Sequence, residues 1–600
     1  MEKKEIVLSI NPCIYGLNYH DPAVVIISEG KILFGIEEER INGVKGSKGI
    51  FPTHAVKAAL THCGCTEDDI TKIAVAYDPC LWKKRLDLEM TKIIFDNIGK
   101  NTGEQEYQVN SEEILRSIIR SELPERYSFF SNPNLVNELI LSKVGKKEAV
   151  DISFYEHHLS HVASSYEVSG FKHAVGIVVD GIGEAEATTI WEIHNHEYRK
   201  IMQINYPNSL GYFYAVATKF LGFEPWQHEG KTMALAAYGH ENKEICDRVQ
   251  TIIDTTGSFY DVSNFVATNS ADYLMLDEDA AMQSIAQKMG FPPRGKEDPV
   301  SNQYIDFAWA VQNVLEKSII ELINWAIQAT GITNVCAAGG VFMNCKMNMV
   351  VRENSLAKNY FVQPLAGDAG LVIGAGLLAS KSNFKGSFSG LNLGPEYSDE
   401  EIEAVLCAAG VKYRKADDLA YEVAQLIAQG KIVGWFEGRM EMGARALGSR
   451  SILADPRDPN MSDRINHLIK HREKWRPFAC SVLEDSCDNI FENYDCEKAF
   501  PFMIEAFKVK EAWVKKIPAV VHRADGTSRP QTVNKNVKPL YYGMINHFKD
   551  ITGCPLVLNT SFNDKGQPIV MSPELAVDFY KRIPIDVLAI GSFLVERSEH

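Results

Sequence analysis

The sequence lacks cysteine pairs, long apolar runs and an excess of positive charge, and each absence excludes a class of protein. It contains 12 cysteines but no Cys-x-x-Cys pair, and the closest two are Cys63 and Cys65. Neither a zinc ribbon nor a disulfide framework is therefore indicated, and a reduced, cytoplasmic setting is expected. No apolar run reaches the ~18 residues of a membrane span, and the first residues lack the apolar core of a signal peptide. We therefore expect no membrane partner.

Positive charge is scarce as well. The 62 Lys and Arg residues are outnumbered by 78 Asp and Glu residues, which gives a net charge of -16. This balance argues against a nucleic-acid partner and slightly favours a neutral or cationic ligand. The content of hydrophobic residues, 45%, is typical of a globular protein with a large core, and 600 residues suggest more than one domain.

The chain is organised around residues 155–184, which contain an unusual cluster of histidines. His157, His158 and His161 lie within five residues, in a segment whose pattern predicts a helix over 155–166. His157 and His161 are four residues apart, so a helix places them on one face. Two imidazoles so placed can share a metal ion with a more distant carboxylate. The alternative is a surface helix with three histidines.

Two acidic residues follow apolar segments that are expected to be strands. Residues 173–180 predict a strand that ends at Asp180, before a turn that begins at Gly181. The backbone N–H groups of that turn are expected to be free for phosphate. Further on, Gly367 and Asp368 open a helix rich in Ala and Gly. Asp368 is well placed to complete the histidine site, or it simply caps the helix.

A loop near the N-terminus displays a second polar pair. His20 and Asp21 lie between an apolar strand and a predicted hairpin that turns at Glu29-Gly30. Phosphate-binding hairpins of the actin-like ATPase superfamily begin in this way. A structural role for such a pair is the alternative, but the apolar strands on both sides favour a displayed polar tip.

Two further loops offer small or cationic residues. Lys231 lies in a glycine-containing loop before a short helix, where it meets phosphate or is a solvated surface lysine. Gly339 and Gly340 follow a buried strand and precede a helix that includes Asn344. Small residues at such a point let the backbone approach a nucleotide closely, although many ordinary turns look similar.

Composition shifts suggest where domains begin and end. Residues 82–150 and 241–303 are charged stretches without recognisable chemistry, and we interpret them as insertions. The stretch 381–400 is polar and contains Gly, Ser and Pro, which is typical of a linker. We therefore predict a domain over 1–385, a linker over 386–400 and a domain over 401–600.

Beyond the linker, a local excess of arginine stands out in an acidic protein. Guanidinium groups match the oxygens of phosphate and carboxylate in a way that surface lysines do not. The arginines lie among Gly, Ala, Leu, Trp, Pro and Phe, which favours a partly buried pocket over a solvated face. The residues concerned are Arg439, Arg445, Arg450, Arg457, Lys470, Arg472, Arg476, Arg523, Arg529, Ser561 and Asn563.

A series of motifs runs in order through nearly the whole chain, from about residue 5 to 595. They are HHLSHVASSY, DGIGE, HEGKTMALAAYG, GGVFMNCKMN, GDAG, EMGARALGSRSILADPRD, IKHREKWRPFA, SRPQTV and NTSFN. Together these motifs resemble those of the O-carbamoyltransferases of natural-product biosynthesis, of the tobramycin and nodulation-factor carbamoyltransferase type. The two insertions match poorly. One departure is Pro530 in SRPQTV, which removes a backbone N–H after Arg529.

The resemblance implies an α/β fold and a two-step activity. An N-terminal, two-lobed actin-like ATPase domain, similar to the Kae proteins, would precede a YrdC-like α/β domain. In such enzymes the C-terminal domain joins carbamoyl phosphate to ATP, giving carbamoyl-adenylate and pyrophosphate. The N-terminal domain then transfers the carbamoyl group to a hydroxyl of a small natural product, with Fe(II) or a similar divalent metal. ATP, with Mg, is a co-substrate.

The resemblance also implies a role for each candidate residue. His157, His161 and Asp368 would hold the metal, with Asp180 close by, and His20 beside Asp21 would deprotonate the acceptor. Residues expected at the nucleotide are Gly181, Lys231, Gly339, Gly340, Asn344 and Gly367. Residues expected at carbamoyl phosphate and the nucleotide phosphates are Arg445, Lys470, Arg472, Arg476, Arg529, Ser561 and Asn563.

Two other functions remain open at this point. One is a different carbamoyl-adenylate or threonylcarbamoyl-adenylate enzyme, although hydrogenase-maturation proteins contain zinc Cys-x-x-Cys pairs and tRNA-modifying enzymes would need a basic face. The other is a non-catalytic nucleotide switch like actin, which would leave the arginine pocket without a role. The sequence does not identify the acceptor alcohol. A homodimer is expected by default.

Overall fold

The computed structural model describes residues 4–13, 20–83, 86, 128–255, 259–262, 278–386, 388–473, 475–495 and 498–597. Most of the first predicted insertion and part of the second lie outside these ranges. The chain forms two compact units. The first comprises Met1–Lys31, Lys48–Phe342 and Asn354–Lys385, and the second comprises Ile32–Ser47, Met343–Glu353 and Gly386–His600. Two short segments that precede residue 386 therefore belong to the second unit.

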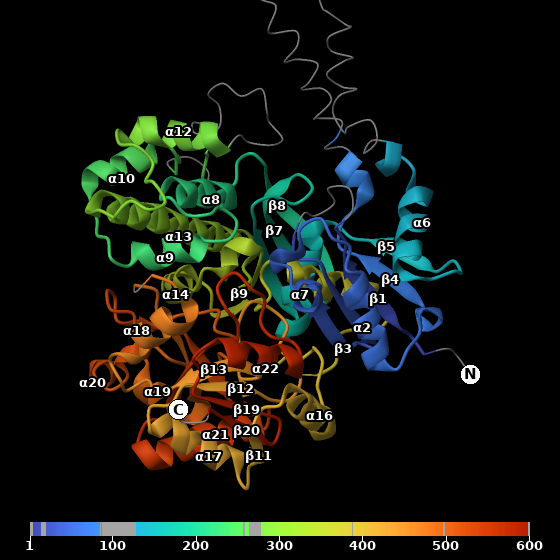
Figure 1. Cartoon of the computed structure of the whole chain (residues 1–600). Coiled ribbons are helices and arrows are strands. Elements are labelled where there is room, and N and C mark those ends of the chain that lie inside the picture. The colour runs from blue at the N-terminus through green and yellow to red at the C-terminus, as the bar shows by residue number, and fades with distance from the viewer. Residues whose placement is uncertain are drawn as a thin grey trace, which may run out of the picture. The chain divides into compact units, whose positions relative to one another are not determined.

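Two five-stranded sheets formed by residues 7–362 share one topology (Figure 1). The first has the order β3-β2-β1-β4-β5, and the second has the order β10-β9-β6-β7-β8. In the first sheet, β1 pairs antiparallel with β2 and parallel with β4, and β4 pairs parallel with β5. In the second sheet, β6 pairs antiparallel with β7 and parallel with β9, and β9 pairs parallel with β10. The strands are β1 (Val7–Asn11), β2 (Ala23–Ser28), β3 (Lys31–Glu37), β4 (Lys72–Val75), β5 (Asp151–Phe154), β6 (His173–Val179), β7 (Glu186–His194), β8 (Glu197–Asn205), β9 (Asn334–Ala338) and β10 (Asn359–Val362).

This repeated topology is the two-lobed actin-like arrangement, so the predicted α/β fold class is confirmed. Two hairpins have tight turns, and the turn at Glu29-Gly30 lies where the sequence predicts it. Glu29 and Gly30 both have positive φ, 51° and 78°, and so do Asn195 and His196, at 48° and 69°. Two central residues with positive φ are typical of the tight turns whose twist matches a β-hairpin.

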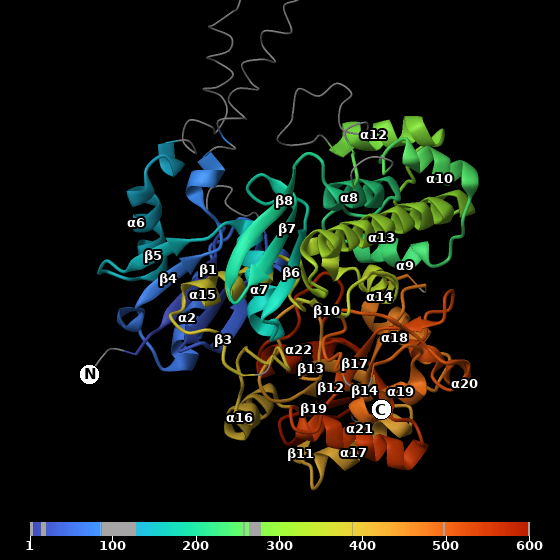
Figure 2. The same cartoon turned by 180° about the vertical axis from the view of Figure 1, so that it is seen from behind.

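Helices α7 (His157–Ser169) and α15 (Leu371–Ala379) pack against each other between the two sheets (Figure 2). Helix α7 contacts β6 and β9, whereas α15 contacts β1, β2 and β4. Gly374 of α15 has no side chain to keep it away from the backbone of Ser160, so the two helices approach closely. Because both helices begin at the same end of this layer, their first residues come together there.

Among the other described helices of the first unit, α2 and α13 pack on strands, and the rest pack mainly on other helices. Helix α2 packs on β2. The 29-residue helix α13 packs against α8, α9 and α10. These helices are α2 (Thr53–Cys63), α6 (Pro133–Val144), α8 (Leu210–Phe220), α9 (Glu229–Ala236), α10 (Lys243–Gln250), α12 (Glu278–Met289) and α13 (Asn302–Thr330).

The second unit is an α/β unit built on a mixed sheet of eight strands. Its order is β11-β20-β19-β12-β13-β18-β14-β17, with parallel pairs at β12/β19 and β14/β17. The strands are β11 (Tyr413–Lys415), β12 (Val433–Phe436), β13 (Arg450–Ala454), β14 (Ala479–Leu483), β17 (Pro530–Val533), β18 (Leu556–Ser561), β19 (Val587–Ile590) and β20 (Phe593–Glu596). Helices of this unit include α14 (Cys345–Asn354), α16 (Asp399–Ala409), α17 (Leu419–Ala428), α21 (Pro539–Thr552) and α22 (Pro573–Arg582).

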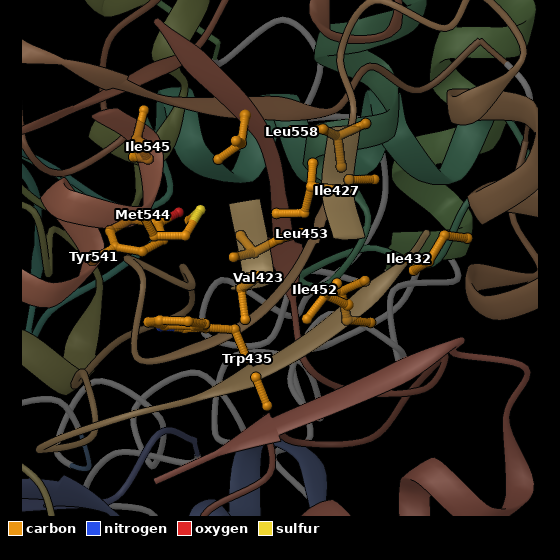
Figure 3. Packing of buried hydrophobic residues seen from close by; sticks show 14 of the residues in the cluster. Val423, Ile427, Ile432, Trp435, Ile452, Leu453, Tyr541, Met544, Ile545 and Leu558 are labelled. Atoms are coloured by element: carbon orange, nitrogen blue, oxygen red, sulfur yellow. The ribbon is translucent and has the colours of Figure 1, made fainter. Parts of the chain in front are cut away.

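The core of the second unit lies between this sheet and the packed helices α17 and α21 (Figure 3). Trp435 of β12 and Tyr541 of α21 are fully buried, with ring centroids 5.9 Å apart. The indole N–H of Trp435 donates to the carbonyl of Gly448 at 3.0 Å, so its polar atom is satisfied inside the core. This core fixes the loop that follows β12, from which Arg445 projects.

No helix among the described residues combines the length and the apolar content that crossing a membrane requires.

Candidate metal centre and anion pocket

Four largely buried side chains of the first unit converge in one place: His157, His161, Asp180 and Asp368. One ligand atom from each lies within 4.8 Å of the others. The Nε2 atoms of His157 and His161 lie 3.0 and 3.2 Å from Oδ2 of Asp180. The same atoms lie 3.9 and 3.6 Å from Oδ1 of Asp368. We call these four residues the metal quartet.

Each member of the quartet is held by the end of a regular element. The histidines lie on the first turns of α7, Asp180 follows the last residue of β6, and Asp368 begins the turn that leads into α15. The structure therefore brings together the two histidines on one helix face and the distant carboxylate that the sequence predicted. It also adds Asp180, whose Oδ2 lies closer to both imidazoles than Asp368 does.

Electrostatics inside the quartet suit a divalent cation. Burial alone would lower the pKa of His161, but hydrogen bonds and charge from Asp180 and Asp368 raise it to about 9. Burial opposes ionisation of Asp180 and Asp368, yet the neighbouring imidazoles hold the pKa of both carboxyl groups below the usual value. Two carboxylates and two neutral imidazoles would balance the charge of one divalent ion, and nitrogen and oxygen donors suit Fe(II) and similar metals. The residues present therefore fit a metal.

The third histidine of the cluster does not belong to the quartet. Nδ1 of His158 lies 2.9 Å from the hydroxyl of Thr189, and its side chain is fully buried. Burial holds the pKa of His158 well below its usual value, with the neighbouring His157 adding to the effect. His158 is therefore a neutral core residue.

Backbone N–H groups support the second oxygen of Asp180. Oδ1 accepts hydrogen bonds from the N–H of Gly181 at 2.7 Å and of Gly340 at 3.2 Å. Gly339 has a φ of 100°, and a Cβ there would lie 2.7 Å from the carbonyl carbon of Val179. These glycines, which were predicted to approach a nucleotide, pack against the end of β6 and hold Asp180 in place.

The turn after Asp180 corrects one expectation. Its N–H groups were predicted to be free for phosphate, but the N–H of Gly181 donates to Asp180 and that of Gly183 donates to the carbonyl of Glu186 at 2.7 Å. The strand end is satisfied internally because β6 and β7 are joined by a short connection whose own polar groups pair with each other.

His20 and Asp21 lie in the loop that Asn11 ties to the quartet. The side-chain amide of Asn11 donates to the carbonyls of Asp21 at 2.9 Å and of Asp368 at 3.2 Å. Nδ1 of His20 lies 3.0 Å from Oδ2 of Asp21, and both side chains are about two-fifths exposed. Burial lowers the pKa of His20, but Asp21, Asp368 and Asp180 together raise it to about 9.

The remaining residues predicted at the nucleotide have visible structural roles. Lys231 lies on α9, with its Nζ 5.3 Å from the ring centroid of Phe223. Asn344 accepts the N–H of Met347 at 3.0 Å and so caps helix α14. Gly367 has extended backbone before Asp368. Contact of these residues with a nucleotide stays a prediction.

In the second unit, four half-buried arginines influence one another: Arg445, Arg472, Arg476 and Arg529. The charge of Arg529, together with burial, lowers the pKa of Arg445 to about 9. Burial and the charges of Arg476 and Arg529 lower the pKa of Arg472 well below its usual value. Nε of Arg529 is buried and has no hydrogen-bond partner among the described residues. We call these four residues the arginine cluster.

Lys470, Ser561 and Asn563 form a separate hydrogen-bonded group. Nζ of Lys470 donates to Oδ1 of Asn563 at 2.8 Å and lies 3.3 Å from the hydroxyl of Ser561. The Ser561 hydroxyl donates to the same Asn563 oxygen at 2.6 Å. Burial and the charge of Arg472 hold the pKa of Lys470 well below its usual value. The influence of Arg472 shows that this group adjoins the arginine cluster.

Comparison with known proteins identifies the family. Two family profiles match the chain: one described as carbamoyltransferase N-terminus over residues 13–377, and one described as carbamoyltransferase C-terminus over residues 424–597. The chain belongs to the carbamoyltransferase family. The predicted resemblance and the predicted enzyme class, a carbamoyltransferase, are thereby confirmed.

Relatives span nearly the whole carbamoyltransferase chain. It is 31% identical over 614 residues to uncharacterized protein sll1178 of Synechocystis sp., which covers 97% of this chain and 95% of that protein. It is also 31% identical over 590 residues to nodulation protein NolNO of Sinorhizobium fredii, covering 96% and 79%. Among solved structures, component A of the (R)-2-hydroxyglutaryl-CoA dehydratase of Acidaminococcus fermentans matches with a TM-score of 0.32 and 13% identity, covering 62% of this chain and 96% of that one.

The arginines of the carbamoyltransferase fall into two groups that the sequence did not separate. Arg439 and Arg450 donate to backbone carbonyl groups, and Arg457 pairs with the carboxylate of Asp455. Arg450 is fully buried and lies 3.6 Å from the ring centroid of Phe436. These three arginines stabilise the second unit, so the predicted single cluster is corrected to the arginine cluster defined above.

Glu184 of the carbamoyltransferase is a site residue that the sequence analysis did not select. Its carboxylate, 1% exposed, accepts the backbone N–H of His157 with both oxygens at 3.0 Å and that of Asp78 at 3.0 Å. It thus caps α7, because Glu156, the N-cap residue just before the helix, makes no side-chain capping hydrogen bond. The sequence signal was the DGIGE motif, in which Glu184 follows β6 and lies 27 residues after His157.

The proline that departs from the family pattern causes no loss of pairing. Pro530 is the first residue of β17, which is the edge strand of the sheet, where a missing N–H is tolerated. The next residue, Gln531, donates to the carbonyl of Leu447 at 2.8 Å. This bond links the strand after Arg529 to the loop after Arg445.

Proposed function

We propose that this carbamoyltransferase forms carbamoyl-adenylate from carbamoyl phosphate and ATP in its second unit. Its first unit then transfers the carbamoyl group to a hydroxyl of a small molecule. The observation that carries the proposal is the arginine cluster of the second unit. The membership of the family supports the carbamoyl chemistry, and the metal quartet supports a separate transfer centre.

The arginine cluster holds more positive charge than its surroundings balance. Arg476 has Glu473 at 4.0 Å, but the dominant neighbours that lower the pKa values of Arg445 and Arg472 are other arginines. Keeping guanidinium groups this close and half-buried costs free energy that a polyanion would return. Carbamoyl phosphate and the triphosphate of ATP are polyanions whose oxygens match the guanidinium fork.

The first reaction balances with water as the third reactant. Water attacks the phosphorus of carbamoyl phosphate, which releases orthophosphate and leaves carbamate. A carbamate oxygen then attacks the α-phosphorus of ATP, and pyrophosphate leaves with the electrons of the broken P–O bond. The products are carbamoyl-adenylate, pyrophosphate and orthophosphate. Positive charge around the phosphates stabilises this transfer without covalent help from the protein.

In the second reaction, the acceptor oxygen attacks the carbamoyl carbon and AMP leaves with the electrons of the broken bond. His20 takes the hydroxyl proton, and Asp21 fixes the tautomer of its ring. His157, His161, Asp180 and Asp368 would hold a divalent ion, which would supply Lewis acidity toward the carbonyl or the leaving phosphate. Glu184 keeps His157 at the start of α7, in position for that ion.

A pyrophosphate-release assay without acceptor tests the adenylation half. We expect the wild-type protein to release pyrophosphate from ATP only when carbamoyl phosphate is present. Arg529→Ala and Arg445→Ala should each lower this rate at least about 100-fold, because each removes a charge that contacts phosphate. The matched control is Arg523→Ala, since Arg523 is half-exposed in the same unit and pairs with Asp463. Its rate should match the wild type.

Two results would contradict the proposal. Equal pyrophosphate release with and without carbamoyl phosphate would show that carbamoyl phosphate is not a substrate of the adenylation reaction. Release that instead requires threonine and bicarbonate would point to a threonylcarbamoyl-adenylate enzyme of the same architecture.

A further inference from the structure

We propose that Trp226 is a specificity-determining residue for the acceptor: its exposed indole forms a wall beside the metal quartet and stacks on a saturated, hydroxylated ring. This inference rests on the proposed function, because it needs an acceptor that reaches the quartet. It adds a residue and an acceptor shape that the motifs of the chain do not identify.

The indole of Trp226 lies directly over the turn that supports the quartet. A Cβ at Gly181 would lie 2.7 Å from Cζ3 of Trp226, so the edge of the six-membered ring packs against Gly181. Gly181 in turn donates its N–H to the carboxylate of Asp180. The indole thus packs against the residue that directly follows Asp180 of the quartet. A side chain at position 181 would displace the ring, which gives this glycine a second reason to be glycine.

Trp226 is held firmly although 44% of its surface is exposed. Its backbone N–H donates to the carboxylate of Glu229 at 2.5 Å, and its indole N–H donates to the carboxylate of Glu278 at 2.7 Å. The ring of Tyr212 lies beside it, with centroids 6.1 Å apart. These contacts fix both ends of the side chain and leave a ring face toward solvent.

The backbone of Trp226 is strained, and the partial burial of its side chain offsets only part of the strain energy. Its φ is 64°, in the left-handed region that bulky residues avoid. Such a conformation costs on the order of 1–3 kcal/mol and persists only where the surroundings impose it, typically at functional sites. In a tryptophan buried in the core, hydrophobic burial would offset the strain energy, whereas this one keeps much of its area in water. A ligand that covers the ring would bury that area and so offset the strain.

The contacts also indicate what the ring recognises. Glu278 is engaged by the indole N–H and by Lys219, whose Nζ lies 3.2 Å away, and Glu229 is engaged by the Trp226 backbone. Both carboxylates that hold the indole are therefore committed, and neither is left to pair with a ligand ammonium group. What remains is the electron-rich ring face, which attracts the polarised C–H groups of a hydroxylated ring. We therefore infer selection by shape and not by charge.

The experiment compares two uncharged probes that have the same number of carbons and hydroxyl groups. Myo-inositol offers a rigid ring face, whereas sorbitol is an open chain. Carbamoylated product is measured by mass spectrometry for the wild type, for Trp226→Ala and for Tyr421→Ala. Tyr421 is the matched control because it is an aromatic residue of the second unit with 42% exposure. Pyrophosphate release without acceptor is measured in parallel for all three proteins.

We expect the wild type and Tyr421→Ala to prefer inositol over sorbitol by at least about tenfold in kcat/KM. Trp226→Ala should lose this preference, mainly through a higher KM for inositol, while its pyrophosphate release stays unchanged. A Trp226→Ala protein that keeps the preference overturns the inference. So does a wild type that releases pyrophosphate but shows no preference for the ring, including one that carbamoylates neither probe. A preference only for a cationic ring amine would replace stacking by a cation–π contact and also overturns it. Loss of pyrophosphate release in the wild type would instead refute the proposed function.

Discussion

Single residues at the metal quartet owe their chemistry to what surrounds them. His158 and His161 lie on the same helix, three residues apart, and both are fully buried. Burial dominates for His158 and keeps its imidazole neutral, whereas the carboxylates of Asp180 and Asp368 raise the pKa of His161 to about 9. The difference comes from which way each ring points from α7. A histidine count alone therefore overstates the ligand set.

The pair of His20 and Asp21 gives a prediction about pH. A general base acts only when it is unprotonated, so a pKa of about 9 for His20 means that transfer speeds up as pH rises toward 9. Below its pKa, the rate should fall about tenfold per pH unit. Asp21→Asn removes one of the groups that raise this pKa, so the rise in rate should move to lower pH. Acceptor carbamoylation measured from pH 6 to 10 checks this.

The pH profile of pyrophosphate release without acceptor is the control for that measurement. It should be the same in the wild type and in Asp21→Asn, because the adenylation residues belong to the second unit. If the transfer profile of Asp21→Asn coincides with that of the wild type, His20 is not the base.

At the scale of elements, the quartet depends on how strand ends and helix starts meet. Helix α7 supplies both histidines, and α15 packs on it closely enough to bring Asp368 within reach. Gly339 and Gly340, just after β9, then press on the end of β6 and hold Asp180. The metal quartet is therefore a product of the layer between the two sheets, and small changes in that layer should reach it.

Alanine substitutions at two glycines with positive φ distinguish a shift of β6, which would disturb the quartet, from ordinary backbone strain. Gly339→Ala places a Cβ 2.7 Å from the carbonyl carbon of Val179, so the end of β6 must shift. We expect a loss of metal affinity of at least about tenfold and a loss of more than about 2 kcal/mol in unfolding free energy. Gly331→Ala meets nothing within 4 Å at a φ of 73°, so it should cost only about 1–2 kcal/mol of strain.

Metal titration and denaturant unfolding of both variants make the comparison. Gly331→Ala should bind metal as the wild type does. Equal metal affinity in Gly339→Ala and Gly331→Ala would mean that Gly339 does not support the metal quartet through β6.

At the scale of the whole molecule, opposite charges are concentrated in different units. The first unit collects carboxylates and imidazoles in the metal quartet, and the second collects guanidinium groups in the arginine cluster. A chain with a net charge of -16 therefore still contains one strongly cationic site. The division agrees with one unit for each half-reaction, which stays a proposal until the halves are separated by experiment.

Paired variants can separate them. His161→Ala removes a metal-quartet side chain, so it should lower the affinity for Co(II) at least about 100-fold and abolish carbamoyl transfer. It should leave carbamoyl phosphate-dependent pyrophosphate release within about twofold of the wild type. Arg529→Ala should do the reverse, with normal Co(II) binding and little pyrophosphate release. Co(II) absorption spectra and the pyrophosphate assay measure the two properties on the same samples.

A circular dichroism spectrum and a melting curve for each variant confirm that it is folded. Should folded His161→Ala lose pyrophosphate release as fully as Arg529→Ala, the two reactions are not assigned to separate units.

Features that arise from local patterns could be predicted from the amino-acid sequence. Apolar strands and turn residues predicted the hairpin at Glu29-Gly30, because side-chain pattern and positive φ are properties of a few neighbouring residues. The spacing of four residues put His157 and His161 on one helix face for the same reason. The ordered motifs identified the family, and the α/β fold class followed from it.

The contacts between side chains that are distant in the sequence became visible in the folded structure alone. Asn11 bonds to Asp368 across 357 residues, and Glu184 caps the helix that begins at His157. Folding also separates the arginines. Arg450 donates hydrogen bonds to backbone carbonyl groups, whereas the charge of Arg529 lowers the pKa of Arg445. A residue type sets which bonds a side chain can make, but burial and long-range packing set which partners are available. Sequence spacing therefore predicts what a residue can do, and the fold decides whether it does it.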